Sequence, residues 1–323
     1  MKVAITGVSG YLGSLLLDRF EQIPEIESIT GIDLKPPRQE SQKLSFHSLD
    51  INGPITRVLA DERVDTLLHL AWVFDPIHDE KATRRVDIDG TKNVLQACDE
   101  VGVKKIIFTS STTSYGVHPD NGKLSTENTP RRGHPAFQYS RDKAEAEALF
   151  EEYQASHPDT CVSIPRICIL AGPHTDNYLS RYVSRSIVFI VQGQDPPFQF
   201  IHEDDAVDVL VKLLLGNHPG AFNIAGEGTI HLGDLGRLFG THLIPVPYSI
   251  LYPFTALFWA LRVKAVTEAP PSVLDFLRYP WVADCSKAKR ELGFQPTYTS
   301  TQALQSYVEA RRANGKWQRL GRA

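Results

Sequence analysis

Motifs for metal binding and for cysteine redox chemistry are missing from this sequence. The four cysteines, Cys98, Cys161, Cys168 and Cys285, have neither metal-ligand spacing nor the basic neighbours of a redox pair. The 11 histidines include no pair four residues apart that would share one face of a helix. We therefore expect free thiols in a reducing compartment and no bound metal.

A membrane-spanning segment is also missing. The most apolar stretch, Ile250–Leu261, has about a dozen residues where a bilayer requires about 20, and Pro253 interrupts it. We expect a buried or substrate-lining helix there; an interfacial membrane contact, or a lid over an apolar substrate, is the alternative. The first apolar run is already a predicted strand rather than the core of a secretion signal, so a cytoplasmic protein is expected.

Strong charge of either sign is absent as well. A net charge of −4 argues against a surface that binds nucleic acid or anionic membranes. The chain has 323 residues, 42% of them hydrophobic, which is enough for a large core. These values favour one large domain with a smaller partner.

The N-terminus carries a glycine pattern typical of dinucleotide binding. A short apolar run from Lys2 leads into Gly7, Gly10 and Gly13, and an apolar helical stretch follows. The first glycine permits a tight turn, the second lets the backbone approach a pyrophosphate, and the third lets the helix pack closely on its strand. The N–H groups at the start of that helix would face the phosphates.

A carboxylate follows at the position that such a site requires. Asp33 ends the second predicted strand, Ser28–Asp33, twenty residues after the last glycine. It would accept hydrogen bonds from the adenosine ribose and repel a 2′-phosphate, which favours NAD over NADP. Lys35 and Arg38 come just after it and could instead receive a 2′-phosphate, so NADP remains possible.

The rest of the first half alternates between buried strands and helices. Thr66–Leu70 and Lys105–Thr109 are predicted strands, residues 89–101 a helix ending at Gly102, and Pro119–Pro135 a loop. Such alternation predicts an α/β fold, a doubly wound parallel sheet of the Rossmann type.

A tyrosine and a lysine that share a helix face indicate proton-transfer chemistry. Tyr139 and Lys143 are four residues apart, so they lie about one turn from each other. An ammonium there is expected to lower the pKa of the phenol, which ordinarily titrates near 10. The tyrosine would then be a usable acid or base near neutral pH.

Together these features resemble the extended short-chain dehydrogenase/reductases, the group that contains the NAD-dependent epimerases and dehydratases. The motifs that carry the resemblance run in the family's order across nearly the whole chain: Thr6–Gly13, Asp50-Ile51, His69–Trp72, Gly90–Asn93, Ser110–Gly116, Tyr139–Lys143, Pro165–Pro173, Phe200–Asp205 and Ala283–Phe294.

The resemblance implies the roles of individual residues. Ser111 corresponds to the catalytic serine, Tyr139 to the acid/base, and Lys143 to the residue that contacts the nicotinamide ribose. The residues implied in binding the dinucleotide are Gly7, Gly10, Tyr11, Leu12, Gly13, Asp33, Asp50, Ile51, Leu70, Ala71, Trp72, Tyr139 and Lys143. Thr112 and Arg278 are candidates for contacting the substrate.

The resemblance also implies domains and assembly. Residues 1–173 would form the dinucleotide-binding domain, with 200–226 returning to it, and residues 174–199 and 227–323 would form a C-terminal α/β substrate domain. The helix that continues from Ala144 has small residues on one side, and the family commonly dimerises through this helix. We therefore expect a homodimer, although packing within one subunit explains the pattern equally well.

Departures from the family pattern bear on the substrate. Sugar-nucleotide epimerases usually have an Asn at the position of Ile169 and an Arg at that of Phe198, and an Asn where this chain has Asp87. Thr112-Thr113 replaces the Asp-Glu pair of dehydratases, which disfavours a dehydratase. If a nucleotide diphosphate binds, Arg278, or else Arg181 or Arg185, must meet its charge.

Three functions remain open from the sequence. The leading prediction is an NAD(P)-dependent epimerase of nucleotide sugars, similar to UDP-glucose 4-epimerase, working through a transient keto intermediate. The main alternative is a reductase or dehydrogenase of an apolar secondary alcohol, of the hydroxysteroid or dihydroflavonol type. The third is an NAD(P)-sensing regulator without turnover, which the presence of Ser111, Tyr139 and Lys143 argues against.

Overall fold

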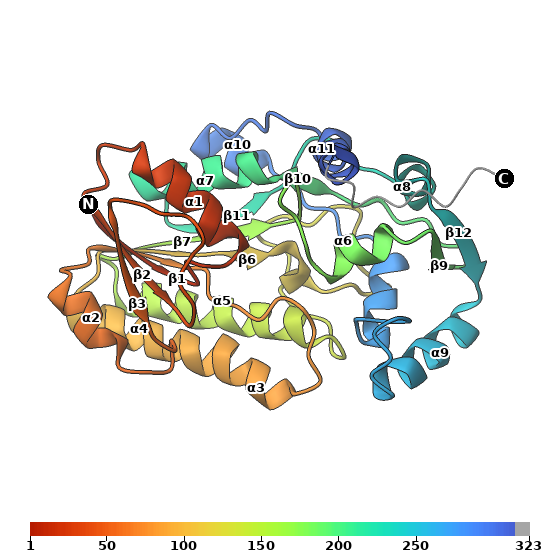
Figure 1. The fold of residues 1–323 in the computed structure, drawn as a ribbon, viewed down its shortest axis with the longest axis horizontal. Coiled ribbons are helices and arrows are strands. Elements are labelled where there is room, and N and C mark those ends of the chain that lie inside the picture. The colour runs from red at the N-terminus through yellow and green to blue at the C-terminus, as the bar shows by residue number, and fades with distance from the viewer. Residues whose placement is uncertain (314–323) are drawn as a thin grey trace.

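A parallel β-sheet forms the centre of the molecule, which we describe for residues 1–313 from a computed structural model (Figure 1). The strand order is β11-β7-β5-β4-β1-β2-β3, and the short β6 also pairs with β7. Every pairing in this sheet is parallel. The strands are β1 (Lys2–Thr6), β2 (Ser28–Asp33), β3 (Leu44–Ser48), β4 (Thr66–His69), β5 (Lys105–Phe108), β6 (Ser110–Ser111), β7 (Cys161–Ile167) and β11 (Gly220–Ile224).

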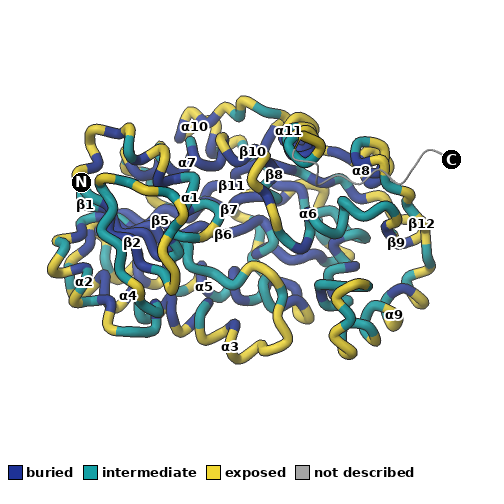
Figure 2. Tube along the Cα trace, viewed as in Figure 1, coloured by how far each residue is buried: buried dark blue, intermediate teal, exposed yellow. Residues whose placement is uncertain are grey.

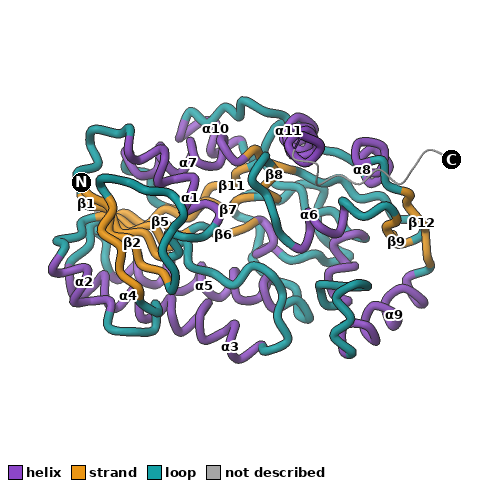
Figure 3. Tube along the Cα trace, in the orientation of Figure 1, coloured by secondary structure: helices purple, strands orange, loops and turns teal. Residues whose placement is uncertain are grey.

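Helices cover both faces of this sheet, as Figure 3 shows. One face packs against α1 (Tyr11–Glu21), α7 (Glu203–Leu215) and α10 (Ser286–Leu292). The other packs against α2 (Ile55–Asp61), α4 (Gly90–Val101) and α5 (Gln138–Ser156). Strands covered on both sides are buried along their whole length; β7, for example, is buried at every position.

The sheet order reverses between β1 and β4, which are adjacent but separated in sequence by β2 and β3. The loops that leave the carboxyl ends of these two strands diverge, and the crevice between them is the usual ligand site of a doubly wound sheet. The glycine loop follows β1, and residues 70–72 follow β4. The fold therefore brings two of the predicted cofactor segments together.

The remaining elements form a second region beside the sheet, at the right of Figure 1. It contains two small parallel sheets, β8 (Ile169–Ala171) with β10 (Phe200–His202), and β9 (Ile187–Val191) with β12 (His242–Val246). Its helices are α6 (Tyr178–Val183), α8 (Leu232–Phe239), α9 (Tyr248–Ala260), the 3₁₀-helix η3 (Pro271–Leu277) and α11 (Ser300–Ala313). The last residues of the predicted substrate domain, 314–323, lie outside the described part of the chain.

Two short elements complete the first region. They are α3 (Glu80–Arg84), which continues directly into a π-helical turn, η1 (Arg85–Asp89), and the 3₁₀-helix η2 (Thr112–Tyr115) after β6. The Rossmann-type α/β fold predicted from the sequence is confirmed, as are the strands predicted at Ser28, Thr66 and Lys105.

The apolar segment Ile250–Leu261 differs from the expectation of a buried helix. Most of α9 is half-buried or exposed (Figure 2). Only Leu251 in this helix is buried, whereas Ile250 and Leu257 are 59% and 55% exposed. The helix packs against β9 and η3 at the edge of the molecule (Figure 1). No helix among residues 1–313 combines the length and apolarity needed to cross a bilayer.

Candidate active site

The glycine loop leaves no room for side chains. Gly7 has φ +74°, and a Cβ on it would lie 2.6 Å from the backbone nitrogen of Ala71. A Cβ on Gly13 would lie 2.5 Å from the carbonyl oxygens of Gly7 and Val8. The first helical hydrogen bond of α1 runs from Ser14 N to Gly10 O at 2.9 Å. The N–H groups of residues 11–13 precede it, so this turn offers donors to a phosphate, as the sequence predicted.

Asp33 lies at the end of β2 with its carboxylate turned toward the glycine loop. It accepts a hydrogen bond from the Ser9 backbone N–H at 3.0 Å and another from Leu34 N–H at 2.7 Å. Each carboxylate oxygen keeps acceptor capacity for the hydroxyls of a ribose. Lys35 and Arg38 are both exposed nearby.

The glycine loop and the segment after β4 form the two walls of the candidate dinucleotide site, which we call the glycine cradle. His69 is buried and held between Thr6 Oγ1 at 2.7 Å and Thr91 Oγ1 at 3.0 Å. Burial, together with the charge of Lys143, lowers the pKa of His69 to about 3, so this ring is neutral. It fixes the end of the strand, from which Leu70, Ala71 and Trp72 continue beside the glycine loop.

Hydrogen bonds from within the turn and from α4 hold the turn after β3 in place. Asp50 Oδ1 accepts the backbone N–H of Asn52 at 2.9 Å, and this bond holds the pKa of Asp50 below its usual range. Asn93 donates to the carbonyl of Ile51 at 2.6 Å. Asp50 and Ile51 thus follow the strand next to Asp33, on the adenine side that the resemblance implies.

Tyr11 has a further role that the sequence did not predict. Its hydroxyl donates to the buried carboxylate of Glu203 on α7 and lies 2.9 Å from Thr175 Oγ1. Burial raises the pKa of Tyr11, and the negative charge of Glu203 adds to this effect. The side chain therefore ties the glycine loop to the segment that enters the second region.

The candidate catalytic serine and tyrosine come together at the carboxyl edge of the sheet. Ser111 is the last residue of β6, and Tyr139 is the second residue of α5. The Tyr139 side chain is hydrogen-bonded to Ser111. A further contact, from Ser140 Oγ to the carbonyl of Thr113 at 2.5 Å, fastens the start of α5 to the segment after Ser111.

Lys143 lies one turn along α5 and is buried. Its ammonium donates to the carbonyl of Thr109 at 2.7 Å and lies 3.6 Å from the ring centroid of Trp72. Burial lowers the pKa of Lys143, while the nearby carboxylates of Asp87 and Glu147 oppose this shift.

The predicted lowering of the tyrosine pKa is wrong for this structure. Burial raises the pKa of Tyr139, the hydrogen bond from Ser111 opposes that shift, and the carboxylate of Asp87 adds to it. The ammonium of Lys143 lies 5.8 Å from the tyrosine ring, and Thr109 and Trp72 are its nearest partners. Burial of the phenol outweighs a cation at that separation.

Asp87, which stands where epimerases usually have an Asn, is a buried carboxyl. It lies on the π-helical turn η1 and accepts the backbone N–H of Val73 at 2.9 Å through one oxygen. The other oxygen is buried without a hydrogen-bond partner. Burial raises the pKa of Asp87, and the attraction of Lys143 opposes this rise.

Three hydroxyls follow Ser111 without partners. The side-chain oxygens of Thr112, Thr113 and Ser114 on η2 are buried and accept or donate no hydrogen bond within the described chain. Buried polar atoms are normally paired, so this cluster is suited to a bound polar group. Thr112, predicted to contact substrate, belongs to it.

A loop from the first region covers Tyr139. Phe74 meets the Tyr139 ring edge-on at a centroid distance of 5.3 Å and lies 5.7 Å from the ring of Tyr178 on α6. Further along, His78 stacks on Trp259 of α9 at 3.8 Å. A small cavity of about 70 Å³ lies between this loop and the start of α5, and Tyr139 lines it.

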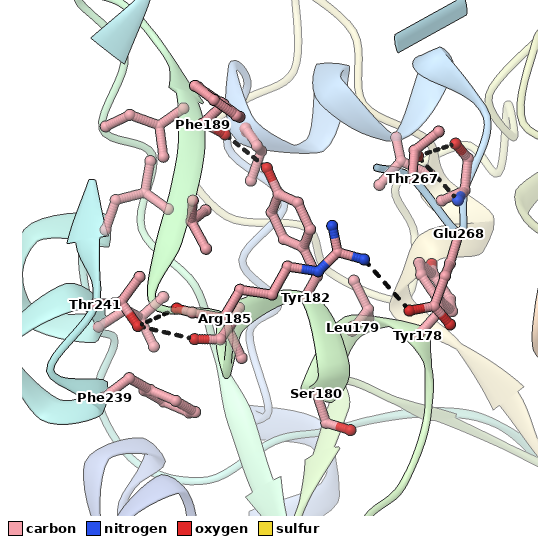
Figure 4. Close-up of a pocket in the computed structure, with 18 of the residues that line it drawn as sticks. Tyr178, Leu179, Ser180, Tyr182, Arg185, Phe189, Phe239, Thr241, Thr267 and Glu268 are labelled. Carbon is pink, nitrogen blue, oxygen red and sulfur yellow. Dashed lines mark hydrogen bonds and ion pairs between the residues drawn. The ribbon is translucent and has the colours of Figure 1, made fainter. Parts of the chain in front are cut away.

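A much larger cavity, of about 470 Å³, lies in the second region (Figure 4). It is enclosed by α6, β9, α8, β12, α9 and η3. Ile169 and Phe198, which stand where sugar-nucleotide epimerases usually carry an Asn and an Arg, both line it. Pro270 lines both cavities, so the two adjoin there.

Arg278, predicted to contact substrate, does not line either cavity in this structure. Its guanidinium pairs with Asp275 at 3.1 Å and stacks over the ring of Tyr248 at 3.9 Å. These contacts hold the side chain against η3 and the start of α9. The direction of the Arg278 side chain depends on the carboxylate of Asp275, three residues before it.

More than half of the chain matches a known protein family. Residues 3–225 match the family model described as the NAD dependent epimerase/dehydratase family. The chain belongs to this family. Its members are NAD-dependent enzymes, and the glycine cradle, with no space for a Cβ at Gly7 or Gly13, fits the dinucleotide.

Curated relatives resemble the chain over most of its length. An uncharacterized protein of Mycobacterium tuberculosis is 27% identical over 317 residues, covering 96% of this chain and 84% of the relative. UDP-glucuronic acid decarboxylase 3 of Arabidopsis thaliana is also 27% identical, over 92% of this chain and 84% of its own length.

Solved structures share the fold at lower identity. The UDP-glucose 4-epimerase of Thermotoga maritima, solved with UDP-glucose, has a TM-score of 0.74 and 20% identity over 97% of this chain and 99% of its own. The dTDP-glucose 4,6-dehydratase of Streptomyces venezuelae gives 0.75 and 20% over 98% and 99%.

Proposed function

We propose that this chain transfers hydride between NAD and the carbinol carbon of a secondary alcohol. The observation that carries the proposal is the grouping of Ser111, Tyr139 and Lys143 at the end of β6 and the start of α5, beside the glycine cradle. Trp72 joins the two parts, because it follows the cradle residue Ala71 and packs on both Lys143 and Tyr139.

Each residue has a distinct part in the proposed reaction. In the reduction direction Tyr139, whose raised pKa keeps it protonated, donates its hydroxyl proton to the ketone oxygen; in the oxidation the tyrosinate takes the hydroxyl proton of the substrate. Ser111 donates a hydrogen bond to the carbonyl oxygen. Lys143 orients the cofactor ribose. When bound in the glycine cradle, NAD⁺ would supply the hydride acceptor for oxidation of the alcohol to a ketone. Thr112 contacts the substrate oxygen or a neighbouring polar group.

Nucleotide-sugar epimerisation, the leading prediction from the sequence, is the second candidate. The relatives that act on or bind UDP- and dTDP-sugars favour it. In an epimerase the ketone is transient, and the hydride returns to the opposite face of the same carbon. The apolar residues at positions 169 and 198 stand against it, as does the pairing of Arg278 with Asp275, since a diphosphate requires free donors.

We also propose the organisation implied by the resemblance. Residues 1–173 with 200–226 would bind the dinucleotide, and 174–199 with the described part of 227–323 would bind substrate. Two copies would associate through α5 in the cytoplasm. Sedimentation of the purified chain with and without NAD tests the dimer, and a monomer at micromolar concentration would contradict it.

The reaction is tested with a panel of UDP-hexoses and neutral secondary alcohols, followed by NADH absorbance and by NMR of the sugar. We expect Tyr139→Phe to reduce turnover by about 10²–10⁴-fold, because proton transfer is lost, while NAD affinity stays within a few-fold. Tyr153→Phe on the same helix, outside the site, is the control. Near-normal turnover by Tyr139→Phe would refute the assignment.

The cofactor preference rests on Asp33. Fluorescence titration with NADH and NADPH should show tighter binding of NADH, because the carboxylate repels a 2′-phosphate. Asp33→Asn should reduce the difference. A preference for NADPH would mean that Lys35 or Arg38 determines the cofactor.

A further inference from the structure

The chemistry of the 470 Å³ cavity indicates what kind of substrate the protein takes. Its volume is in the range of sites for small organic ligands, about 300–1,000 Å³. Apolar side chains from every enclosing element line it, among them Leu179, Val188, Phe189, Phe239, Leu251 and Leu277. A ligand that fills this space is desolvated against hydrocarbon over most of its surface.

Polar side chains in the wall are engaged by the protein itself, as Figure 4 shows. Tyr182 donates its hydroxyl to the carbonyl of Phe189 at 2.6 Å. Thr241 bonds to the carbonyl of Arg185 at 2.9 Å, and Thr267 to that of Ala269 at 2.7 Å. These bonds turn polar atoms toward the backbone and leave hydrocarbon facing the cavity.

The charges at the wall do not suit an anionic ligand. Arg185 is the one lysine or arginine among the described residues that line the cavity. It donates to Val266 O at 2.7 Å and pairs with Glu268 at 3.5 Å. Glu268, itself a lining residue, also pairs with Arg181, which binds Asp75 at 2.7 Å as well. A diphosphate there would meet a carboxylate and a cation that is already paired.

The cavity continues toward the candidate catalytic residues. Tyr178 and Val273 line it, and Val273 also packs in the apolar cluster that includes Tyr139. Phe74 stands between the rings of Tyr178 and Tyr139. It is 38% exposed on a loop and lines the small cavity, which adjoins the large one at Pro270.

The two ends of this path differ in polarity. At one end are Tyr139, Ser111 and the unpartnered hydroxyls of Thr112 and Thr113. At the other end is the hydrocarbon-lined cavity. We infer that the substrate is a neutral secondary alcohol, or its ketone, whose hydrocarbon chain or ring occupies the 470 Å³ cavity. This inference rests on the proposed hydride transfer and adds the substrate class to it.

Binding is tested first with Nile red, a neutral apolar dye, on the full chain with NAD present. We expect saturable binding with a blue-shifted emission. Thr255→Trp places bulk in the cavity from α9 and should weaken binding at least tenfold, whereas Ala260→Trp, exposed on the same helix and outside the cavity, should not. Leu179→Trp on α6 repeats the test from another wall. Circular dichroism checks that each variant is folded.

Displacement of the dye then tests the class of ligand. In the series 2-octanol, 2-decanol and 2-dodecanol, affinity should rise about threefold to fourfold per methylene, the value expected for burying hydrocarbon. UDP and UDP-glucose at millimolar concentration should not displace the dye. No saturable dye binding, displacement by UDP, or alcohol affinities that do not depend on chain length would each overturn the inference.

Turnover separates this inference from the function on which it rests. Length-dependent alcohol binding without Tyr139-dependent formation of NADH from any alcohol in the panel supports the cavity assignment and counts against the hydride transfer. Tyr139-dependent epimerisation of a UDP-hexose by a chain that binds no dye has the opposite meaning. It would confirm the proposed chemistry and overturn the apolar substrate.

Discussion

The ammonium of Lys143 lies 3.6 Å from the ring centroid of Trp72, closer than to the ring of Tyr139 at 5.8 Å. The indole therefore provides a face for this cation in the interior, together with the carbonyl of Thr109. Because Trp72 also follows the cradle residue Ala71, a single side chain links the dinucleotide cradle with the proton-transfer residues.

Replacing Lys143 by Met should impair both cofactor binding and turnover. The ammonium is the group proposed to hold the ribose, and a thioether cannot donate to it. We expect NAD affinity to fall at least tenfold and turnover at saturating NAD to fall about 10²-fold or more. Calorimetry and NADH absorbance measure the two. Loss of turnover with unchanged NAD affinity would show that Lys143 does not touch the cofactor.

Gly13→Ala should remove cofactor binding through packing. Its Cβ would lie 2.5 Å from two backbone carbonyl oxygens, so α1 must shift away from the glycine loop at a cost of about 1–3 kcal/mol in unfolding free energy. Gly233→Ala in α8 is the matched control, because nothing lies within 4 Å of where its Cβ would stand and alanine favours helix. Urea unfolding and NADH titration compare the two; equal behaviour would contradict the packing argument.

Asp87→Asn should change how stability depends on pH. Burial raises the pKa of Asp87 to about 7 from 3.8, so the folded protein holds a proton that the unfolded chain releases. The wild type therefore loses unfolding free energy relative to the variant as pH rises from about 4 to 7, by at most about 1.4 kcal/mol per pH unit. Urea unfolding across this range measures the difference, and a constant difference would refute the buried, proton-binding carboxyl.

Glu147→Gln should destabilise the protein, because Glu147 is fully buried against Arg166 at 2.8 Å and also bonds Ser110 beside Ser111. Removing one member of a buried pair typically costs about 3–5 kcal/mol of unfolding free energy. Glu145 lies on the same helix as Glu147 but forms an exposed pair with Arg84 of α3. Glu145→Gln should therefore lower the unfolding free energy by less than about 1 kcal/mol. Similar losses in both variants, measured by urea unfolding, would contradict the role of the buried pair.

Local patterns carried most of what the sequence predicted. The glycines after β1, the carboxylate ending β2 and the buried strands each depend on neighbours within a few residues, so the sheet and the cradle could be predicted. The interactions of Asp87 with Val73, of Phe74 with Tyr139 and Tyr178, and of Arg278 with Tyr248 depend on how separate loops meet. No spacing in the sequence encodes those contacts.

In the large cavity, too, local features could be predicted from the sequence and contacts between distant segments could not. Ile169 and Phe198 depart from the pattern of sugar-nucleotide epimerases, and both line the large cavity. The ion pairs of Arg181 and Arg185 with Glu268 depend on the folded structure and could not be predicted from the sequence. A helix as apolar as α9 was expected to be buried or to line the substrate site. It lines the large cavity, while its position at the edge of the molecule, with Ile250 and Leu257 exposed, is a tertiary feature.

The central place of β1 affects the order in which the chain can fold. One edge of β1 pairs with β2, which follows it closely in sequence, through Lys2↔Ser28. Its other partner, β4, lies more than sixty residues further on, in the pairing Val3↔Thr66, and the far side of the sheet is completed only when β11 pairs with β7, through Gly220↔Ser163. Parallel pairings between distant segments form slowly, so one edge of the apolar strand β1 stays unpaired during synthesis until β4 has emerged. Chaperone contact during synthesis is the expected consequence for this N-terminus.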